Sequence, residues 1–501
     1  MTELAIFDQG RAPPCPDPFN LAAYVLAAGA DDGVALEVFG ETVERWRYAD
    51  LLDAVWRTAG GLLDLGLKDG DRLLLRVGND PAFPVLFLAA VAVGVVPVPT
   101  SALLTDPEVR RIVTELRPAM VAFAGGLKPL ADLGVPTLDA KGVAQLRLAE
   151  PAQPVMGSPD RLAYMIYTSG TSGQPRAVMH AHRAVWARRL MWDGWYGLRP
   201  DDRMLHAGAF NWTYTLGTGL MDPWAIGATA MVYTGPADRT VWGRLVRDHG
   251  ATIFAAAPGV YRQIVEAGAD GFEDLRHGLS AGEKMPATVM EAWQAQTGKA
   301  VYEALGMSEV STFVSSSPNV APRSGTAGKA QDGRKLAVLG RDGPVRVDEA
   351  GVMAVSKDDP GLMLGYFEQP EETAAKYQDQ WFVTGDIVSM DGDGYVTYLG
   401  RDDDMMNAGG YRVSPIEVEA AMMRCRGVLM AAAAAVEVRE GVRVIAGFYV
   451  ADVDLSDSLR EICTEDLAKY KTPRIFVKMD ALPKGANNKI QRKTLRDWTP
   501  K

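Results

Sequence analysis

Residues 167–178 read Tyr-Thr-Ser-Gly-Thr-Ser-Gly-Gln-Pro-Arg-Ala-Val, a stretch in which hydroxyl side chains alternate with glycine before one cation. This composition suits a turn that wraps a polyphosphate, because glycine lets backbone N–H groups approach the oxygens and the hydroxyls add donors. Arg176 adds charge as a planar, bidentate fork. The apolar run 162–167 predicts a buried strand, so the turn is expected to leave a sheet edge, where ligands tend to bind. The residues expected to hold the phosphates are Thr168, Ser169, Gly170, Thr171, Ser172, Gly173 and Arg176.

The stretch is not a Walker A motif, because Gln174-Pro175-Arg176 occupies the place where such a loop enters its helix. A flexible Ser/Gly linker is the alternative, but a linker needs neither the apolar run before the turn nor the Pro-Arg after it. The stretch resembles the phosphate loop of the adenylate-forming superfamily, which includes acyl- and aryl-CoA synthetases. That pattern usually ends Pro-Lys-Gly, whereas this chain has Pro175-Arg176-Ala177. Arg176 keeps the positive charge of the lysine but carries it on a planar guanidinium group.

The bulk composition narrows the class of protein. A chain of 501 residues is too long for one core and predicts two or more domains. The net charge of −11 argues against nucleic-acid partners and anionic membrane surfaces. Three scattered cysteines show neither a disulfide framework nor zinc spacing, which favours a reducing, cytoplasmic location. His180 and His182 lie close together, but without a supporting Cys or carboxylate this pair favours a structural role over metal binding.

One segment, 81–105, is long and apolar enough in principle to cross a bilayer. Four prolines interrupt it, and the polar residues Ser101 and Thr105 make its end less apolar. A buried helix at about 84–94 followed by a buried strand at about 95–99 fits better, so no membrane insertion is expected.

The order of elements predicts an α/β protein. From about 40 to 395, short apolar runs such as 72–76 and 229–233 alternate with helical patterns such as 48–65 and 106–116, as in doubly wound parallel sheets. Around 340–400, frequent turn signals predict an antiparallel, barrel-like subdomain. The last hundred or so residues predict a compact α+β domain, whose first helix begins at Ser414-Pro415-Ile416-Glu417. We therefore expect an N-terminal domain over 1–400, a hinge at 401–404 and a mobile C-terminal domain over 405–501.

Further segments match the superfamily in order along nearly the whole chain. Residues 302–309 resemble its aromatic-x-x-Ser/Thr-Glu signature. Glu309 is a candidate ligand of Mg²⁺, since this hard cation prefers carboxylate oxygens and screens phosphate charge. Ser308 is expected to donate to the α-phosphate, and Glu303 is placed among the nucleotide contacts.

Two more segments are expected to contact the nucleoside. Residues 280–285, which include Gly282, Glu283 and Lys284, resemble the segment that cradles adenine, although a plain turn between strand and helix is the alternative. Residues 381–386 resemble the aromatic-x-Thr-Gly-Asp motif, whose carboxylate, here Asp386, accepts from both ribose hydroxyls; an ordinary Asp-containing turn is the alternative. The resemblance gives Arg401 a second ribose or phosphate contact.

The C-terminal motifs concern motion and catalysis. Three consecutive carboxylates at 402–404 diverge too far to share one metal ion, and the resemblance places the hinge at Asp403. Residues 482–492 resemble the motif of the catalytic lysine, here Lys489, with Asn488 replacing its usual glycine. The resemblance also assigns coenzyme A contacts to Gly409, Gly410 and Arg412.

The resemblance implies an ATP-dependent carboxylate–CoA ligase that works through an acyl-adenylate and uses ATP, Mg²⁺ and coenzyme A. The C-terminal domain is expected to rotate between the two half-reactions. A stand-alone protein that loads a carrier-protein thiol and a non-catalytic nucleotide-binding relative are the alternatives. The acid is expected to be a medium-chain, alicyclic or aromatic monocarboxylate. Its pocket is expected to be lined by Trp212, Tyr214, Ala281, Ala304, Leu305, Gly306 and Met307.

Overall fold

The computed structural model describes residues 3–8, 10–168, 176–236, 238, 240–408, 411–439, 442–484 and 490–499, with the backbone alone at 407, 408, 411, 412, 439 and 442. The chain divides into two compact units. The larger unit comprises Phe7–Lys335 and Val355–Phe382, and the smaller comprises Met1–Ile6, Leu336–Ala354 and Val383–Lys501. The hinge expected at 401–404 falls inside the smaller unit, and the predicted domain boundaries stay predictions.

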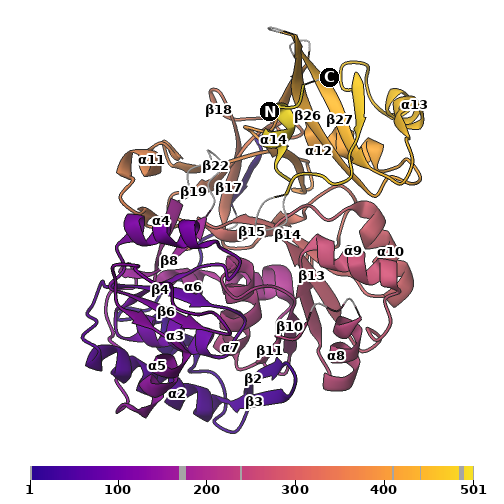
Figure 1. Cartoon of the computed structure of the whole chain (residues 1–501). Helices are drawn as coiled ribbons and strands as arrows, with labels where there is room; N and C mark the ends of the chain where they lie inside the picture. The colour runs from indigo at the N-terminus through magenta and orange to yellow at the C-terminus, as the bar shows by residue number, and fades with distance from the viewer. Residues whose placement is uncertain are drawn as a thin grey trace. The chain divides into compact units, whose positions relative to one another are not determined.

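A nine-stranded sheet is the largest element of the larger unit (Figure 1). Neighbouring strands run parallel from β14 through β13, β12, β10 and β11 to β2, while β15, β16 and β3 add antiparallel edges. The order is β16 (Lys329–Ala330), β15 (Ser311–Ser315), β14 (Val301–Met307), β13 (His277–Ala281), β12 (Ile253–Ala256), β10 (Arg203–His206), β11 (Thr229–Tyr233), β2 (Val34–Phe39) and β3 (Val43–Arg47).

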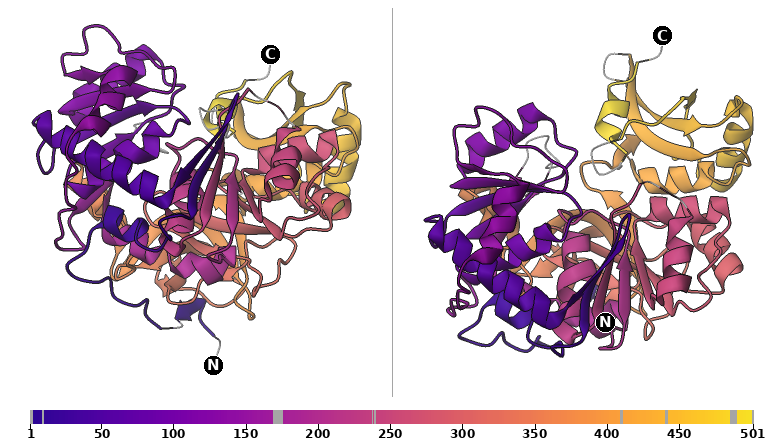
Figure 2. Two further views of the ribbon diagram at one scale, coloured as in Figure 1. Left: turned by 90° about the horizontal axis from the view of Figure 1, so that it is seen from below. Right: turned by 60° about the horizontal axis from the view of Figure 1, so that its bottom comes forward.

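Three helices, α8 (Val241–His249), α9 (Pro258–Ala267) and α10 (Ala287–Thr297), lie along one face of this sheet (Figures 1 and 2). Phe254 of β12, Tyr261 of α9 and Trp293 of α10 share one buried aromatic cluster. Burial of aromatic rings between sheet and helix contributes much of the stability of such layers. The predicted alternation of strands and helices around a parallel sheet is confirmed.

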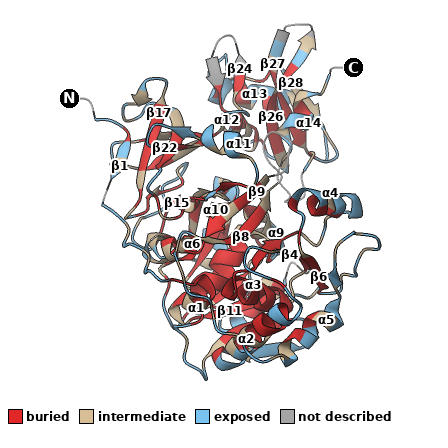
Figure 3. Cartoon of the chain, turned by 90° about the vertical axis from the view of Figure 1, so that its left-hand side faces the viewer, coloured by how far each residue is buried: buried red, intermediate tan, exposed pale blue. Residues whose placement is uncertain are grey.

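A second, four-stranded parallel sheet has the order β5 (Val96–Pro99), β4 (Arg72–Val77), β6 (Met120–Ala124) and β7 (Thr137–Leu138). Helices α2 (Tyr48–Asp64), α3 (Ala82–Ala92) and α4 (Asp106–Leu116) belong to the same region. Every residue of α3 is buried (Figure 3). The helix and strand predicted within 81–105 are therefore confirmed. Among the described helices, none is both long and apolar enough to span a bilayer.

A small antiparallel sheet carries the turn quoted first. Its order is β20 (Gly365–Tyr366), β9 (Arg176–Ala181) and β8 (Leu162–Thr168), and Thr168 pairs with Arg176 across the hairpin. Residues 169–175, which include five of the expected phosphate contacts, lie outside the described part of the chain. Strands β8 and β9, on either side of this stretch, are antiparallel, and Arg176 begins β9.

In the smaller unit, β19 (Gly351–Ser356) lies between β17 (Lys335–Gly340) and β22 (Trp381–Met390), with β18 (Gly343–Pro344) beside β17 and β23 (Val396–Arg401) beside β22. These strands occupy the place predicted for the barrel-like subdomain. The final part has β26 (Met430–Arg439) antiparallel to β27 (Val442–Val450), and β28 (Ile475–Lys478) parallel to β27. Its helices are α12 (Pro415–Met422), α13 (Ser456–Asp466) and α14 (Arg492–Arg496).

The predicted start of α12 is confirmed, because the Ser414 side chain accepts a hydrogen bond from the Glu417 N–H. The remaining elements are short. They are β1 (Ile6–Asp8), α1 (Leu21–Val25), α5 (Ala140–Gln145), α6 (Arg183–Ala187), α7 (Asp222–Ile226), α11 (Pro370–Ala374), β21 (Tyr377–Gln378), β24 (Met406–Ala408) and β25 (Tyr411–Val413), with single turns of 3₁₀ or π helix at Leu146–Leu148, Trp192–Tyr196 and Thr215–Met221.

Candidate active site

A polar cluster of four side chains is built around Arg176, the first described residue after the glycine-rich stretch. Arg176 forms an ion pair with Glu372 of α11, and its guanidinium lies 5.0 Å from the centre of the Tyr366 ring. Tyr366 Oη donates to Glu309 Oε1 at 2.7 Å. We call these residues, Arg176, Glu309, Tyr366 and Glu372, the Arg176 cluster.

Several chain segments meet in this cluster. The Glu309 backbone carbonyl accepts from the Met363 N–H at 2.8 Å, which ties the end of β14 to the approach to β20. Burial and the adjoining Glu309 carboxylate both raise the pKa of Tyr366, so its hydroxyl stays a proton donor. The structure brings together Arg176 and Glu309, which the sequence analysis selected, through Tyr366, which it missed.

Glu309 fits the expected Mg²⁺ ligand. Its carboxylate is half-buried, and one of its oxygens carries a single hydrogen bond from Tyr366. Within the described residues, no group of three or more His, Cys, Asp or Glu side chains could hold a metal ion. One carboxylate is a common protein contribution to Mg²⁺, which keeps several waters and binds phosphate oxygens. Glu309 is therefore suited to a Mg²⁺ ion whose other ligands are water and the phosphates of a nucleotide.

In the segment expected to cradle adenine, the backbone at Gly282 lies close to the side chain of Trp212. Gly282 has φ +94°, and a Cβ atom there would lie 2.6 Å from Cζ2 of Trp212. Only glycine therefore permits the indole to lie so close to this turn. Glu283 is exposed, and Lys284 Nζ donates to the Gly325 carbonyl at 3.3 Å.

Glu303 is a buried carboxyl group beside this segment. Its Oε1 accepts from the Met285 N–H at 3.1 Å. Burial raises the pKa of Glu303 to about 7, against smaller opposing effects of that hydrogen bond and of Lys284. A neutral carboxyl group can both donate and accept, which suits contact with a heterocyclic base.

The residues expected to line the acid pocket lie in three places. Met307 lines a cavity, as does Ser308 beside it. Tyr214 is instead buried in a packed apolar cluster, where its hydroxyl donates to the Leu279 carbonyl at 3.1 Å. Ala281 and Ala304 belong to the same cluster, and Trp212 packs against it. Leu305 and Gly306 mark an irregularity in the pairing of β14 with β15.

The cavity is small, with an internal volume of about 30 Å³. Strands β8, β9, β14 and β15, helix α6 and the turn Thr215–Met221 all contribute to its walls. Its apolar lining consists of Tyr164, Ala184, Leu216, Met221, Met307 and Val310, and its other lining residues are His180, Arg188, Thr213, Ser308, Ser311 and Gly361.

Most of these lining residues were missed by the sequence analysis. His180 was assigned a structural role, and Arg188 and Ser311 were not selected. One signal was available for His180. In strand β9, Arg176, Val178 and His180 alternate with Ala177 and Met179, so Arg176 and this histidine share one face.

In the smaller unit, Asp386 and Arg401, both expected to contact the ribose, form an ion pair. Arg401 Nη1 donates to Asp386 Oδ1 at 3.1 Å, and Tyr398 Oη is 3.5 Å from the same oxygen. The sequence analysis missed Tyr398. Thr384 Oγ1 donates to the Met353 carbonyl and accepts from the Asp386 N–H, which fixes the backbone before the carboxylate.

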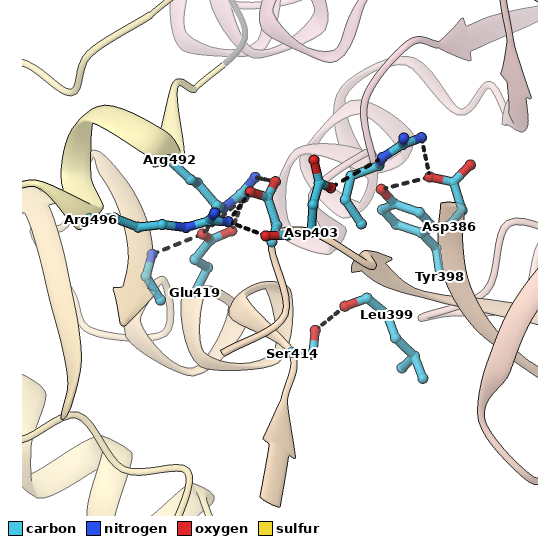
Figure 4. A network of polar contacts seen from close by, with 11 residues as sticks. Asp386, Tyr398, Leu399, Asp403, Ser414, Glu419, Arg492 and Arg496 are labelled. Carbon is cyan, nitrogen blue, oxygen red and sulfur yellow. Dashed lines mark hydrogen bonds and ion pairs between the residues drawn. The ribbon is translucent and has the colours of Figure 1, made fainter. Parts of the chain in front are cut away.

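The residues around the expected hinge contact helix α14. Arg496 Nη2 donates to the Asp403 carbonyl at 2.6 Å and also to the Asp404 carboxylate (Figure 4). Arg492 forms a bidentate pair with the partly buried Glu419 and lies 3.7 Å from Asp404. Of the other expected residues of this unit, Gly409, Gly410 and Lys489 lie outside the described residues, as does the Arg412 side chain.

Comparison with known proteins agrees with this layout. The AMP-binding enzyme family matches residues 26–367, and the AMP-binding enzyme C-terminal domain matches 417–489. The 4-hydroxybenzoate–CoA/benzoate–CoA ligase of Rhodopseudomonas palustris is 33% identical over 90% of this chain and 89% of its own length. The benzoate–CoA ligase of Thauera aromatica is 31% identical, covering 99% of this chain and 100% of its own. The structure of a benzoate CoA ligase from Burkholderia xenovorans LB400 is 27% identical with a TM-score of 0.86, covering 96% of this chain and 100% of its own.

Proposed function

The chain belongs to the AMP-binding enzyme family, and we propose that it joins an aromatic monocarboxylic acid to coenzyme A at the expense of ATP. The products are the acyl-CoA, AMP and diphosphate, and the intermediate is an acyl-adenylate. One observation carries the proposal. Met307 and Ser308 line the cavity, and the next residue, Glu309, belongs to the Arg176 cluster.

In the first half-reaction the acid's carboxylate attacks the α-phosphorus of ATP, and diphosphate leaves. Two anions must approach each other, so the protein has to supply preorganised positive charge and N–H donors. Arg176 would hold the departing diphosphate together with the backbone N–H groups of the glycine-rich turn. Mg²⁺ bound beside Glu309 would supply further charge neutralisation. The apolar walls of the cavity would exclude water from the reactive anhydride.

The roles in the smaller unit rest on the family resemblance. Asp386 and Arg401 would contact the ribose, and Lys489 would bridge the carboxylate and the α-phosphate. Gly409, Gly410 and Arg412 would face coenzyme A after rotation about Asp403. The thiol then attacks the acyl carbon and releases AMP.

Lys489→Ala tests whether Lys489 serves only the first half-reaction, adenylation of the acid. Loss of one transition-state donor costs about 10²–10³ in rate, so acid-dependent diphosphate release should fall by that factor. Thioester formation from supplied acyl-AMP should persist. The matched control is Lys493→Ala, an exposed lysine in α14, which should leave both half-reactions unchanged. Equal loss of both half-reactions in Lys489→Ala would refute the assignment.

The identity of the thiol separates the main alternatives. Incubation with ATP, benzoate and either free coenzyme A or a phosphopantetheine-bearing carrier protein should give thioester with free coenzyme A. Thioester on the carrier alone would establish the stand-alone loading protein instead. ATP binding without diphosphate release for any acid would establish a non-catalytic family member.

A further inference from the structure

The turn between β14 and β15, residues 308–310, carries two of the expected nucleotide contacts, Ser308 and Glu309. Ser311 pairs with Met307 at the base of this turn. Such a short turn makes few contacts of its own, so the elements packed against it decide where its side chains lie. The position of the Glu309 carboxylate therefore depends on what holds the base and the side of the turn.

Ser311, at the base of the turn, is held by Arg188. Its Oγ accepts a hydrogen bond from Arg188 Nη1 at 2.6 Å. Its backbone has φ +84°, a left-handed conformation that residues other than glycine adopt at a cost. Strained backbone of this kind persists only where surrounding contacts fix it, and it gathers at functional sites. The hydrogen bond from Arg188 is such a contact.

The Arg188 side chain is itself fixed by a buried network. Its Nε donates to Asp222 Oδ1 at 2.9 Å, and its Nη2 donates to Oδ2 at 2.6 Å. Tyr196 Oη donates to the same carboxylate at 2.8 Å. Gly217 makes room for the guanidinium, since a Cβ atom there would lie 2.1 Å from Arg188 Cζ. Asp222 thus engages Nε and Nη2, while Nη1 is directed at Ser311.

The side of the turn packs against a second buried ion pair, formed by Arg334 and Asp359. Asp359 Oδ1 also accepts from the Gly361 N–H at 2.8 Å. Gly361 lies against the turn, because a Cβ atom there would be 2.7 Å from the Val310 carbonyl oxygen. The turn therefore lies between two buried ion pairs that come from different segments of the chain.

Stability alone does not explain the Arg188–Asp222 pair. Removing two charges from water costs about as much as their attraction returns, and apolar residues of similar volume are often at least as stabilising. An apolar pair, however, has no donor to direct at a third group. A guanidinium fixed on one carboxylate presents its remaining N–H groups in a rigid plane. The pair is therefore suited to setting the position of Ser311.

We propose that Arg188 and Ser311 are positioning residues for adenylation, which hold the turn so that the Glu309 carboxylate faces the Mg²⁺ that a nucleotide brings. This inference rests on the proposed function and adds two residues to it. Both act through Glu309 rather than on the nucleotide itself. Without the hydrogen bond from Arg188, Ser311 would relax toward a negative φ, and the neighbouring Glu309 carboxylate would shift.

The test measures the Kd for ATP by calorimetry on the full chain without acid, once with Mg²⁺ and once with EDTA, and takes the ratio of the two values. Ser311→Ala removes the hydroxyl and leaves the buried ion pair intact. The gain in affinity that Mg²⁺ gives should fall about 10-fold, as for groups that orient a metal ligand, while the Kd in EDTA stays within about 2-fold. Ser311→Gly, which adopts a positive φ at no cost, should restore part of the gain.

A double-mutant cycle shows whether Ser311 acts through Glu309. Glu309→Gln should lower the Mg²⁺-dependent gain, and adding Ser311→Ala should lower it no further. The matched control is Ser315→Ala, which removes another buried hydroxyl of β15, one that donates to the Gly194 carbonyl, and should leave the gain unchanged.

Arg188→Met/Asp222→Leu decides the matter if Ser311→Ala does not fold, because it removes the donor without leaving a buried charge unpaired. It should show the same fall. A gain equal to that of the wild type in folded Ser311→Ala, an equal further fall in the Glu309→Gln background, or a wild type whose Kd for ATP is indifferent to Mg²⁺ would each overturn the inference and leave the proposed function standing. Failure of the wild type to release diphosphate with any acid, a separate assay, would overturn the proposed function itself, and the inference with it.

Discussion

Glu303 couples the stability of the larger unit to pH. Its pKa is raised from 4.5 to about 7, so between these values the folded state holds a proton that the unfolded state has released. Stability contributed by this group is therefore present below pH 4.5 and is lost as pH rises toward 7, by at most about 3 kcal/mol. We expect Glu303→Gln to flatten the pH dependence of the free energy of unfolding in this window. Urea titrations between pH 4.5 and 8 measure it, and parallel curves for wild type and variant would contradict the assignment.

The Arg188–Asp222 pair stabilises the cavity wall only while both partners are present. Arg188→Met leaves a buried carboxylate without its cation, and we expect a loss of about 3–5 kcal/mol in the free energy of unfolding. The double variant Arg188→Met/Asp222→Leu should recover most of that loss, because an apolar pair of similar volume avoids the desolvation of two charges. Chemical denaturation of both variants checks this prediction. A double variant no more stable than the single one would contradict it.

Individual residues differ in how well the sequence could identify them. Arg176 could be selected because it follows a stretch whose hydroxyls and glycines suit phosphate, and Glu309 because its segment resembles the family signature. His180, Arg188 and Ser311 were not, since they meet only through the long-range packing of β9, α6 and β15. A lone buried histidine has the same local sequence signature whether its nitrogens are paired or not.

At the scale of elements, helix α11 supplies the ion-pair partner of Arg176, the arginine expected to bind phosphate. The Arg176–Glu372 ion pair would have to open for Arg176 to bind diphosphate. Glu372→Gln should therefore lower KM for ATP by about 2- to 5-fold, the range of a partly exposed ion pair, and the gain should shrink at high salt. The control is Glu371→Gln, an exposed neighbour in the same helix. An unchanged KM for ATP at low salt would show that the pair does not compete with the nucleotide.

Elements with strong local signals were predicted well. The capped start of α12 and the apolar run that became α3 and β5 both appear as expected. Helix α14 and the β8–β9 pairing were harder. A five-residue helix has too few turns for a periodic pattern, and antiparallel pairing across a glycine-rich turn depends on residues distant in space.

Across the smaller unit, helix α14 restrains the expected hinge. Arg496 holds both the Asp403 carbonyl and the Asp404 side chain. In Arg496→Ala we expect backbone amide exchange at 402–405 to become about 2- to 5-fold faster, since these contacts are partly exposed. Lys493→Ala in the same helix is the control. Exchange at 402–405 that matches the wild type in Arg496→Ala would contradict a restraining role.

For the whole molecule, the central claim is that the protein activates an aromatic acid by adenylation. Acid-dependent exchange of labelled diphosphate into ATP measures this half-reaction directly and needs neither coenzyme A nor domain rotation. We predict exchange with benzoate or a hydroxybenzoate and none when the acid is omitted. Tight ATP binding with no exchange for any acid supplied would contradict the account.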